Sequence, residues 1–102
     1  MATPAGTSPT TATMLGQVGW PTLGAVSGGR VRELAPGHVS LPVAHGYRVE
    51  VALDPMSDTY TVTRRWVRGV QSRVRGEVAR VNAGELAEVV YRASLYRDPF
   101  GE

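Results

Sequence analysis

The chain has no cysteine, no lysine and no long hydrophobic run. Without cysteine it cannot have a disulfide framework, a thiolate metal site or a cysteine nucleophile. No run approaches the roughly 20 apolar residues that a membrane-spanning helix needs, and the N-terminus lacks the basic start and apolar stretch of a secretory signal. We therefore expect a cytoplasmic protein that does not enter a membrane, and no motif indicates a cofactor.

The length of 102 residues leaves room for one domain. Residues 1–30 are rich in Thr, Ala, Gly and Pro without helical or strand periodicity, which predicts a flexible arm. Residues 31–102 are expected to form a small α+β domain, with the clearest pattern at 47–98. The patterned segment of about 55 residues is near the lower limit for a domain that is stable alone. A partner or self-association would therefore help to stabilise it.

The excess of positive over negative charge lies in one part of the chain. The net charge is +2, and all eleven basic residues are arginine, whose planar fork suits phosphate and carboxylate. Residues 56–81 carry six arginines against two acids, which gives +4, whereas residues 82–102 carry two against four, which gives −2. The alternative explanation for the arginines is a GC-rich genome, which favours their codons over those of lysine.

The firmest expected strands are residues 47–53 and 60–67, which form a hairpin. Apolar side chains alternate along residues 47–53, and Asp54-Pro55 begins a typical turn. If Asp54 faces Thr59, then Val51 lies opposite Val62 and residue 47 lies opposite residue 66. Two more short strands at 31–34 and 39–43 are a further possibility, so the sheet is antiparallel with three, four or five strands.

A second hairpin is expected from residues 60–67 and 70–81, with its turn near Arg68-Gly69. A two-residue turn there would put Val74 and Val78 on the polar side of the sheet. Because a slip of one residue inverts every side chain, the loop must have an odd length or the strand must contain a bulge. Gly69 and Gly76 are the candidate positions.

A helix is predicted from Asn82 onward. Asn82 and Glu85 have the spacing of a capping box, and apolar residues then repeat at helical spacing as far as Tyr96. Arg97 suits the C-terminal end of the helix dipole, and Pro99 stops the pattern. This C-terminal helix should cover one face of the sheet, namely Val49, Val51, Val62, Val74 and Val78.

The other face of the sheet is the candidate binding surface. By strand parity it should carry Arg48, Glu50, Thr61, Thr63, Arg65, Arg73, Arg75 and Glu77, with Arg68 at the hairpin tip. Its arginines would neutralise phosphates in a salt-dependent way, and a β-sheet can read bases in the major groove. The candidate nucleic-acid-binding residues are Arg48, Arg65, Arg68, Arg73 and Arg75. The alternative is a solvated face that keeps the sheet soluble.

The aromatic residues Tyr47, Tyr60 and Trp66 suggest base stacking. By parity, however, they face the helix, so we expect them to pack in the core. Arg64 shares this parity and is expected to reach solvent at an edge.

Three strands followed by one helix is also the order of the plant ethylene-response DNA-binding domain and of arm-binding domains of tyrosine recombinases. Residues 59–95, from TYTVTRRW to RASL, resemble the strand–strand–helix half of double-stranded-RNA-binding domains. The basic pair at the start of that family's last helix is replaced here by Asn82-Ala83-Gly84-Glu85. The resemblance is one of topology, so it implies a fold and no activity.

No catalytic or metal-binding constellation is predicted. The carboxylates are spread over turns, the outer helix face and the sheet, and His38 and His45 have no further ligands near them in the sequence. We therefore expect a non-enzymatic protein. The first hypothesis is a small basic protein that associates with nucleic acid or has a regulatory role. The alternative is a protein-interaction or assembly module, such as a phage or mobile-element accessory or structural protein, that acts through sheet edges and the N-terminal arm.

Overall fold

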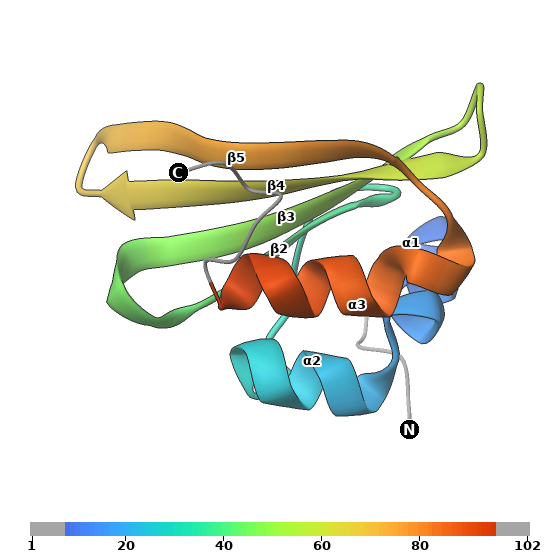
Figure 1. Ribbon diagram of the computed structural model, residues 1–102, viewed down its shortest axis with the longest axis horizontal. Coiled ribbons are helices and arrows are strands. Elements are labelled where there is room, and N and C mark those ends of the chain that lie inside the picture. The colour runs from blue at the N-terminus through green and yellow to red at the C-terminus, as the bar shows by residue number, and fades with distance from the viewer. Residues whose placement is uncertain (1–7, 96–102) are drawn as a thin grey trace.

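The structure is a computed structural model that describes residues 8–95. Its elements, in chain order, are α1 (Pro9–Val18), α2 (Trp20–Ser27), β1 (Arg32–Ala35), β2 (His38–Pro42), the 3-10 turn η1 (Ala44–Gly46), β3 (Tyr47–Asp54), β4 (Thr59–Arg68), β5 (Gln71–Val81) and α3 (Ala83–Ser94). Figure 1 shows them as one sheet with the helices on one side. The prediction of an α+β fold with an antiparallel sheet and a C-terminal helix is confirmed.

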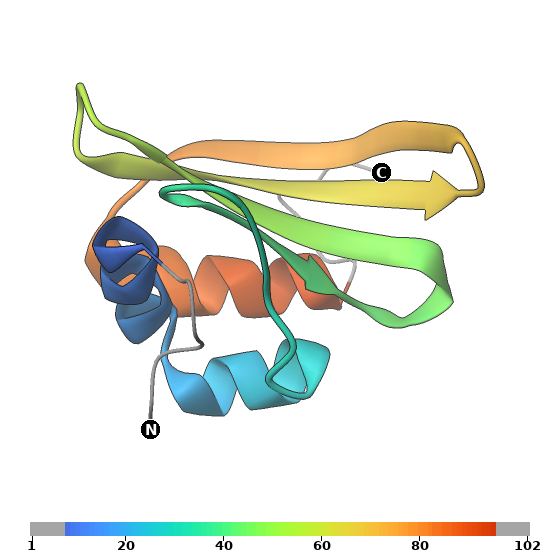
Figure 2. The same cartoon turned by 180° about the vertical axis from the view of Figure 1, so that it is seen from behind.

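The sheet is a five-stranded antiparallel meander in the order β1-β2-β3-β4-β5. All three helices lie on the same face, and α3 packs directly against the middle of the sheet with α1 and α2 around it (Figures 1 and 2). The far end of the β4–β5 hairpin and the start of β3 extend past the C-terminal end of α3 in both views. No described helix has the length and apolar character needed to cross a bilayer.

The β3–β4 register agrees with the sequence analysis. Asp54 pairs with Thr59, Val51 with Val62 and Tyr47 with Trp66. Val51 and Val62 are fully buried under the helices. Consecutive side chains point to opposite faces, so this register fixes which side chains of β4 point away from the helices.

The β4–β5 pairing differs from the expected register. Its two-residue turn is Gly69-Val70, so Arg68 pairs with Gln71, Trp66 with Arg73 and Arg65 with Val74. The register shifts once opposite Arg64 and again before Val81. The first shift falls at Gly76, as predicted, but it comes after Val74 and therefore returns only Val78 to the helix side. Val74 is consequently 53% exposed on the opposite face, and its expected core position was wrong.

The prediction of a flexible arm over residues 1–30 is wrong for residues 9–27, which form α1 and α2. The Ser8 hydroxyl accepts a hydrogen bond from the Thr11 backbone N–H at 3.2 Å, and Pro9 occupies the first turn. Met14 and Leu23 are fully buried against α3 and the sheet. The hydrophobic core therefore includes the segment that composition alone assigned to an arm.

The C-terminal helix begins as predicted. Asn82 and Glu85 form a capping box, and the apolar side of α3 buries Leu86, Val90 and Ala93. The predictions for Tyr96, Arg97 and Pro99 lie outside the described residues.

Arg64 is fully buried, so its expected position at a solvent-exposed edge was wrong. Its guanidinium donates to the backbone oxygen of Ala93 and to that of Arg75, each at 3.4 Å. The first acceptor belongs to the last turn of α3, whose carbonyl end attracts cations. The second belongs to the bulged part of β5. Arg64 thus joins the end of α3 to the irregular region of β5.

Candidate functional site

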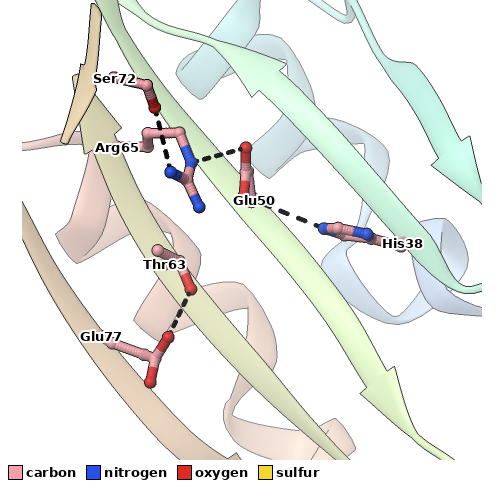
Figure 3. Close-up of polar contacts among 6 residues, drawn as sticks. All are labelled: His38, Glu50, Thr63, Arg65, Ser72 and Glu77. Atoms are coloured by element: carbon pink, nitrogen blue, oxygen red, sulfur yellow. Dashed lines mark hydrogen bonds and ion pairs between the residues drawn. The ribbon is translucent and has the colours of Figure 1, made fainter. Parts of the chain in front are cut away.

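The sheet face turned away from the helices carries a network of polar contacts (Figure 3). The Arg65 guanidinium donates through Nε to Glu50 at 3.1 Å and through Nη1 to Ser72 at 3.0 Å. His38 Nε2 lies 3.9 Å from the other oxygen of Glu50, and the Thr63 hydroxyl donates to Glu77 at 3.1 Å. Two carboxylates therefore lie among the basic groups of this face.

This outer face is a poor anion site in its centre because its charge is compensated. The Glu50 side chain is only 14% exposed and contacts Arg65 directly. Removing that contact to bind phosphate would leave a largely buried carboxylate without its ion pair. Arg48 is paired with Arg65 across the strands and remains the outer-face cation of β3.

The five predicted nucleic-acid-binding arginines do not share one face, so the expected single platform was wrong. Arg48 and Arg65 point away from the helices, as predicted. Arg73 pairs with Trp66 and therefore lies on the helix side, and Arg75 lines the same recess there. The physical reason is the turn at Gly69-Val70, since the compensating shift at Gly76 comes after both arginines in the chain.

A recess of about 300 Å³ lies on the helix side of the sheet. The far end of the β4–β5 hairpin and the start of β3, which line it, extend past the C-terminal end of α3 (Figure 2). The described residues that line it are Tyr47 from β3, Trp66 from β4, and Gln71, Arg73 and Arg75 from β5. Tyr47 and Trp66 are directly paired and half-buried, whereas the three β5 residues are exposed. The next pair on this face, Val49 and Arg64, is fully buried under the helices. We name this the distal recess.

A second recess, of about 370 Å³, also adjoins Trp66 and is lined by His45, Gly46, Trp66, Val67 and Arg68. Gly46 is in close contact with Trp66, since a Cβ built there would lie 3.6 Å from the indole Nε1 and 2.9 Å from the Val67 backbone oxygen. Gly46 has a φ of 82°, a left-handed conformation that glycine adopts without strain. We name this the turn recess.

The described lining of the two recesses is positively charged and contains no acidic side chain. The guanidinium groups of Arg68, Arg73 and Arg75 make no hydrogen bond or ion pair with other residues of the described range 8–95. No Asp or Glu among the described residues lines either recess. A phosphate could approach these groups without displacing a salt bridge between described residues, in contrast to Arg65 on the outer face.

The perturbed titratable groups lie elsewhere and serve the fold. Hydrogen bonds from Thr11 and Ser8 lower the pKa of Glu33. The Met56 backbone N–H and the Ser57 hydroxyl lower the pKa of Asp54 in the β3–β4 turn. Burial raises the pKa of Tyr60, whose hydroxyl donates to Gln17 of α1. These groups secure β1, the turn and α1, and none of them lines a recess.

Metal ligation has no support in the described part of the chain. No group of three or more His, Cys, Asp or Glu residues lies close enough to hold an ion there. His38 contacts Glu50 alone in the outer network, and His45 lines the turn recess.

Sequence reasoning missed the combination of aromatic and basic side chains in the distal recess. Tyr47 and Trp66 were expected in the core, yet both are half-buried at the wall of a recess. The available signal was the Gly69-Val70 turn, because a hairpin closed there places Arg73 opposite Trp66.

Comparisons with protein-family models, with curated proteins and with solved structures each gave no match.

Proposed function

We propose that this chain is a small, cytoplasmic, non-catalytic protein that binds nucleic acid through the distal recess. In this proposal Arg73 and Arg75 contact phosphate and Trp66 contacts a base. The observation that carries it is the position of two exposed guanidinium groups, which have no partner among the described residues, beside a half-buried indole.

The chemistry of the two residue types supports this ligand. Guanidinium forms charge-assisted, often bidentate, hydrogen bonds with phosphate oxygens. Stacking of a base on an aromatic side chain contributes about 1–3 kcal/mol and tolerates any base. A site that combines the two favours phosphate esters with an attached ring over simple inorganic anions.

Fluorescence anisotropy with a labelled oligonucleotide tests the proposal with a charge-matched control. The test variant is Arg73→Ala/Arg75→Ala, and the control is Arg32→Ala/Arg48→Ala at two arginines outside the recess. Each pair changes the net charge from +2 to 0 by removing two positive charges. Any difference between the variants therefore reflects the position of the charge and not its amount.

The test variant should bind at least about tenfold more weakly, and the slope of its log affinity against log salt should fall by about 1.4 for a single strand. The affinity of the control should stay within about threefold of that of the parent, because salt screens the interaction between the ligand and charges distant from the recess. Equal loss in both variants, or no binding by the parent at about 50 mM salt, would exclude this site.

A second candidate function, a protein-interaction module, is favoured by the open edge of β5. This strand spans Gln71–Val81, and among the described strands it pairs with β4 alone. An exposed edge can accept an extended peptide. The register shifts of β5 near Gly76 and Arg80, however, interrupt this edge. Bulges of this kind prevent unwanted pairing in other sheets. Light scattering of the purified chain tests self-association, and a monomer at all concentrations would exclude a dimer through this edge.

A further inference from the structure

We infer that the ligand is a single strand rather than a duplex, and that consecutive nucleotides occupy the distal recess and the turn recess on either side of Trp66. This inference rests on the proposed function and adds the strandedness and the minimum length of the ligand.

Trp66 lines both recesses, so both adjoin this residue. Each recess also has its own cation: Arg73 and Arg75 in the distal recess and Arg68 in the turn recess. Arg73 lies directly across the ladder from Trp66, and Arg68 follows Trp66 by two residues on the same strand face. Trp66 therefore has one cation across the ladder and another two residues along its own strand. In this proposal a base stacks on Trp66 while the phosphates on its two sides contact these cations.

The half-burial of Trp66 and Tyr47 favours an unpaired strand. Bases inside a duplex are stacked on both faces and present only their edges in the grooves. A ring that forms the wall of a recess can stack only on a base that has left such a stack. The recess volumes of about 300 and 370 Å³ are at the lower end for small-molecule sites, which suits one unit of a polymer in each.

The experiment follows Trp66 fluorescence in a Trp20→Phe background, in which Trp66 is the remaining tryptophan. The probes are thymidine monophosphate, oligothymidylates of about two, three and eight nucleotides, an oligouridylate of the greatest length, and a duplex of matched length. Thymidylate and uridylate separate DNA from RNA as the source of the single strand.

Affinity should rise at least about tenfold from one to two nucleotides and then increase only slightly. The duplex should bind at least about tenfold more weakly than the longest single strand, since unstacking a base costs a few kcal/mol, roughly. Arg68→Ala should remove the gain from the second nucleotide, so that its affinities for the monophosphate and the dinucleotide become similar. Arg68 is exposed at the hairpin end, so this variant keeps the test independent of any folding defect at Trp66.

Equal affinity for duplex and single strand, with binding still lost in Arg73→Ala/Arg75→Ala, would overturn this inference and leave the proposed function standing. A monophosphate that binds as tightly as the longest strand would likewise overturn it. If none of the probes binds, the proposed function itself fails.

Discussion

Trp66 and Arg73 are directly paired across β4 and β5, so the indole and the guanidinium project from the same face of the hairpin. Arg65, the next residue along β4 from Trp66, projects from the other face and forms an ion pair with Glu50. One strand position thus separates an arginine with an ion pair from a recess whose arginines have no ion pair within residues 8–95. The candidate site depends on the β4–β5 register more than on the number of arginines.

Gly46 should be intolerant of a side chain. In Gly46→Ala the new methyl group would lie 2.9 Å from the Val67 backbone oxygen, at a φ of 82°. We expect a loss of about 1–3 kcal/mol in the free energy of unfolding and weaker ligand binding, because the backbone behind Trp66 must move.

The matched control is Gly16→Ala in α1, where a Cβ meets no atom within 4 Å. This change should stabilise the protein by about 0.5–1 kcal/mol, since alanine suits a helix better than glycine. Urea denaturation measures both variants. The free energy of unfolding should fall in Gly46→Ala and rise in Gly16→Ala. A Gly46→Ala protein as stable as the parent would contradict the contact with Val67.

The N-terminal segment should contribute to the core. Met14 is fully buried, so Met14→Ala should lower the free energy of unfolding by about 2–5 kcal/mol. Thr13→Ala changes an exposed position of the same helix and should stay within about 0.5 kcal/mol. Comparable urea midpoints for the two variants would mean that α1 does not belong to the cooperative core.

Glu33 should make the free energy of unfolding depend on pH in the acidic range. Hydrogen bonds from Thr11 and Ser8 hold the pKa of Glu33 in the folded protein below its ordinary value of 4.5. Glu33 therefore binds a proton more readily in the unfolded chain than in the folded protein. Its contribution to stability is fully present above the unfolded pKa of 4.5 and is lost as the pH falls through the folded pKa.

Thermal midpoints of the parent and of Glu33→Gln, compared from about pH 6 to about pH 3, test this. The parent should be the more stable at the higher pH and should lose its advantage toward the lower. Asp54 titrates in the same acidic direction but is present in both proteins, so it cancels in the difference. A stability difference that does not change with pH would rule out the contribution of Glu33.

The sequence was sufficient for those parts of the fold that local rules determine. The pairing of Val51 with Val62 followed from alternation and a short turn, and the start of α3 followed from Asn82 and Glu85. The N-terminal helices were missed because Thr, Gly and Pro dominate that composition. The useful signals were the Ser8-Pro9 start and the buried spacing of Met14 and Val18.

The faces of β5 could not be assigned from the sequence alone. The apolar spacing of Val74 and Val78 indicated one continuous core face, but the register shift lies between them. Parity therefore placed Arg73 and Arg75 on the wrong side of the sheet. The burial of Arg64 could not be predicted from the sequence either, because its hydrogen-bond acceptors belong to the end of α3 and to the bulge in β5.

NMR of the side-chain N–H groups distinguishes binding in the distal recess from binding on the outer face, because these groups report each face of the sheet separately. On titration with a short oligothymidylate, we expect the indole N–H of Trp66 and the Nε–H of Arg73 to shift together, while the Nε–H of Arg65 beside Glu50 stays in place. Shifts confined to Arg65 and Arg48, with Trp66 and Arg73 unchanged, would put the ligand on the outer face and rule out binding in the distal recess.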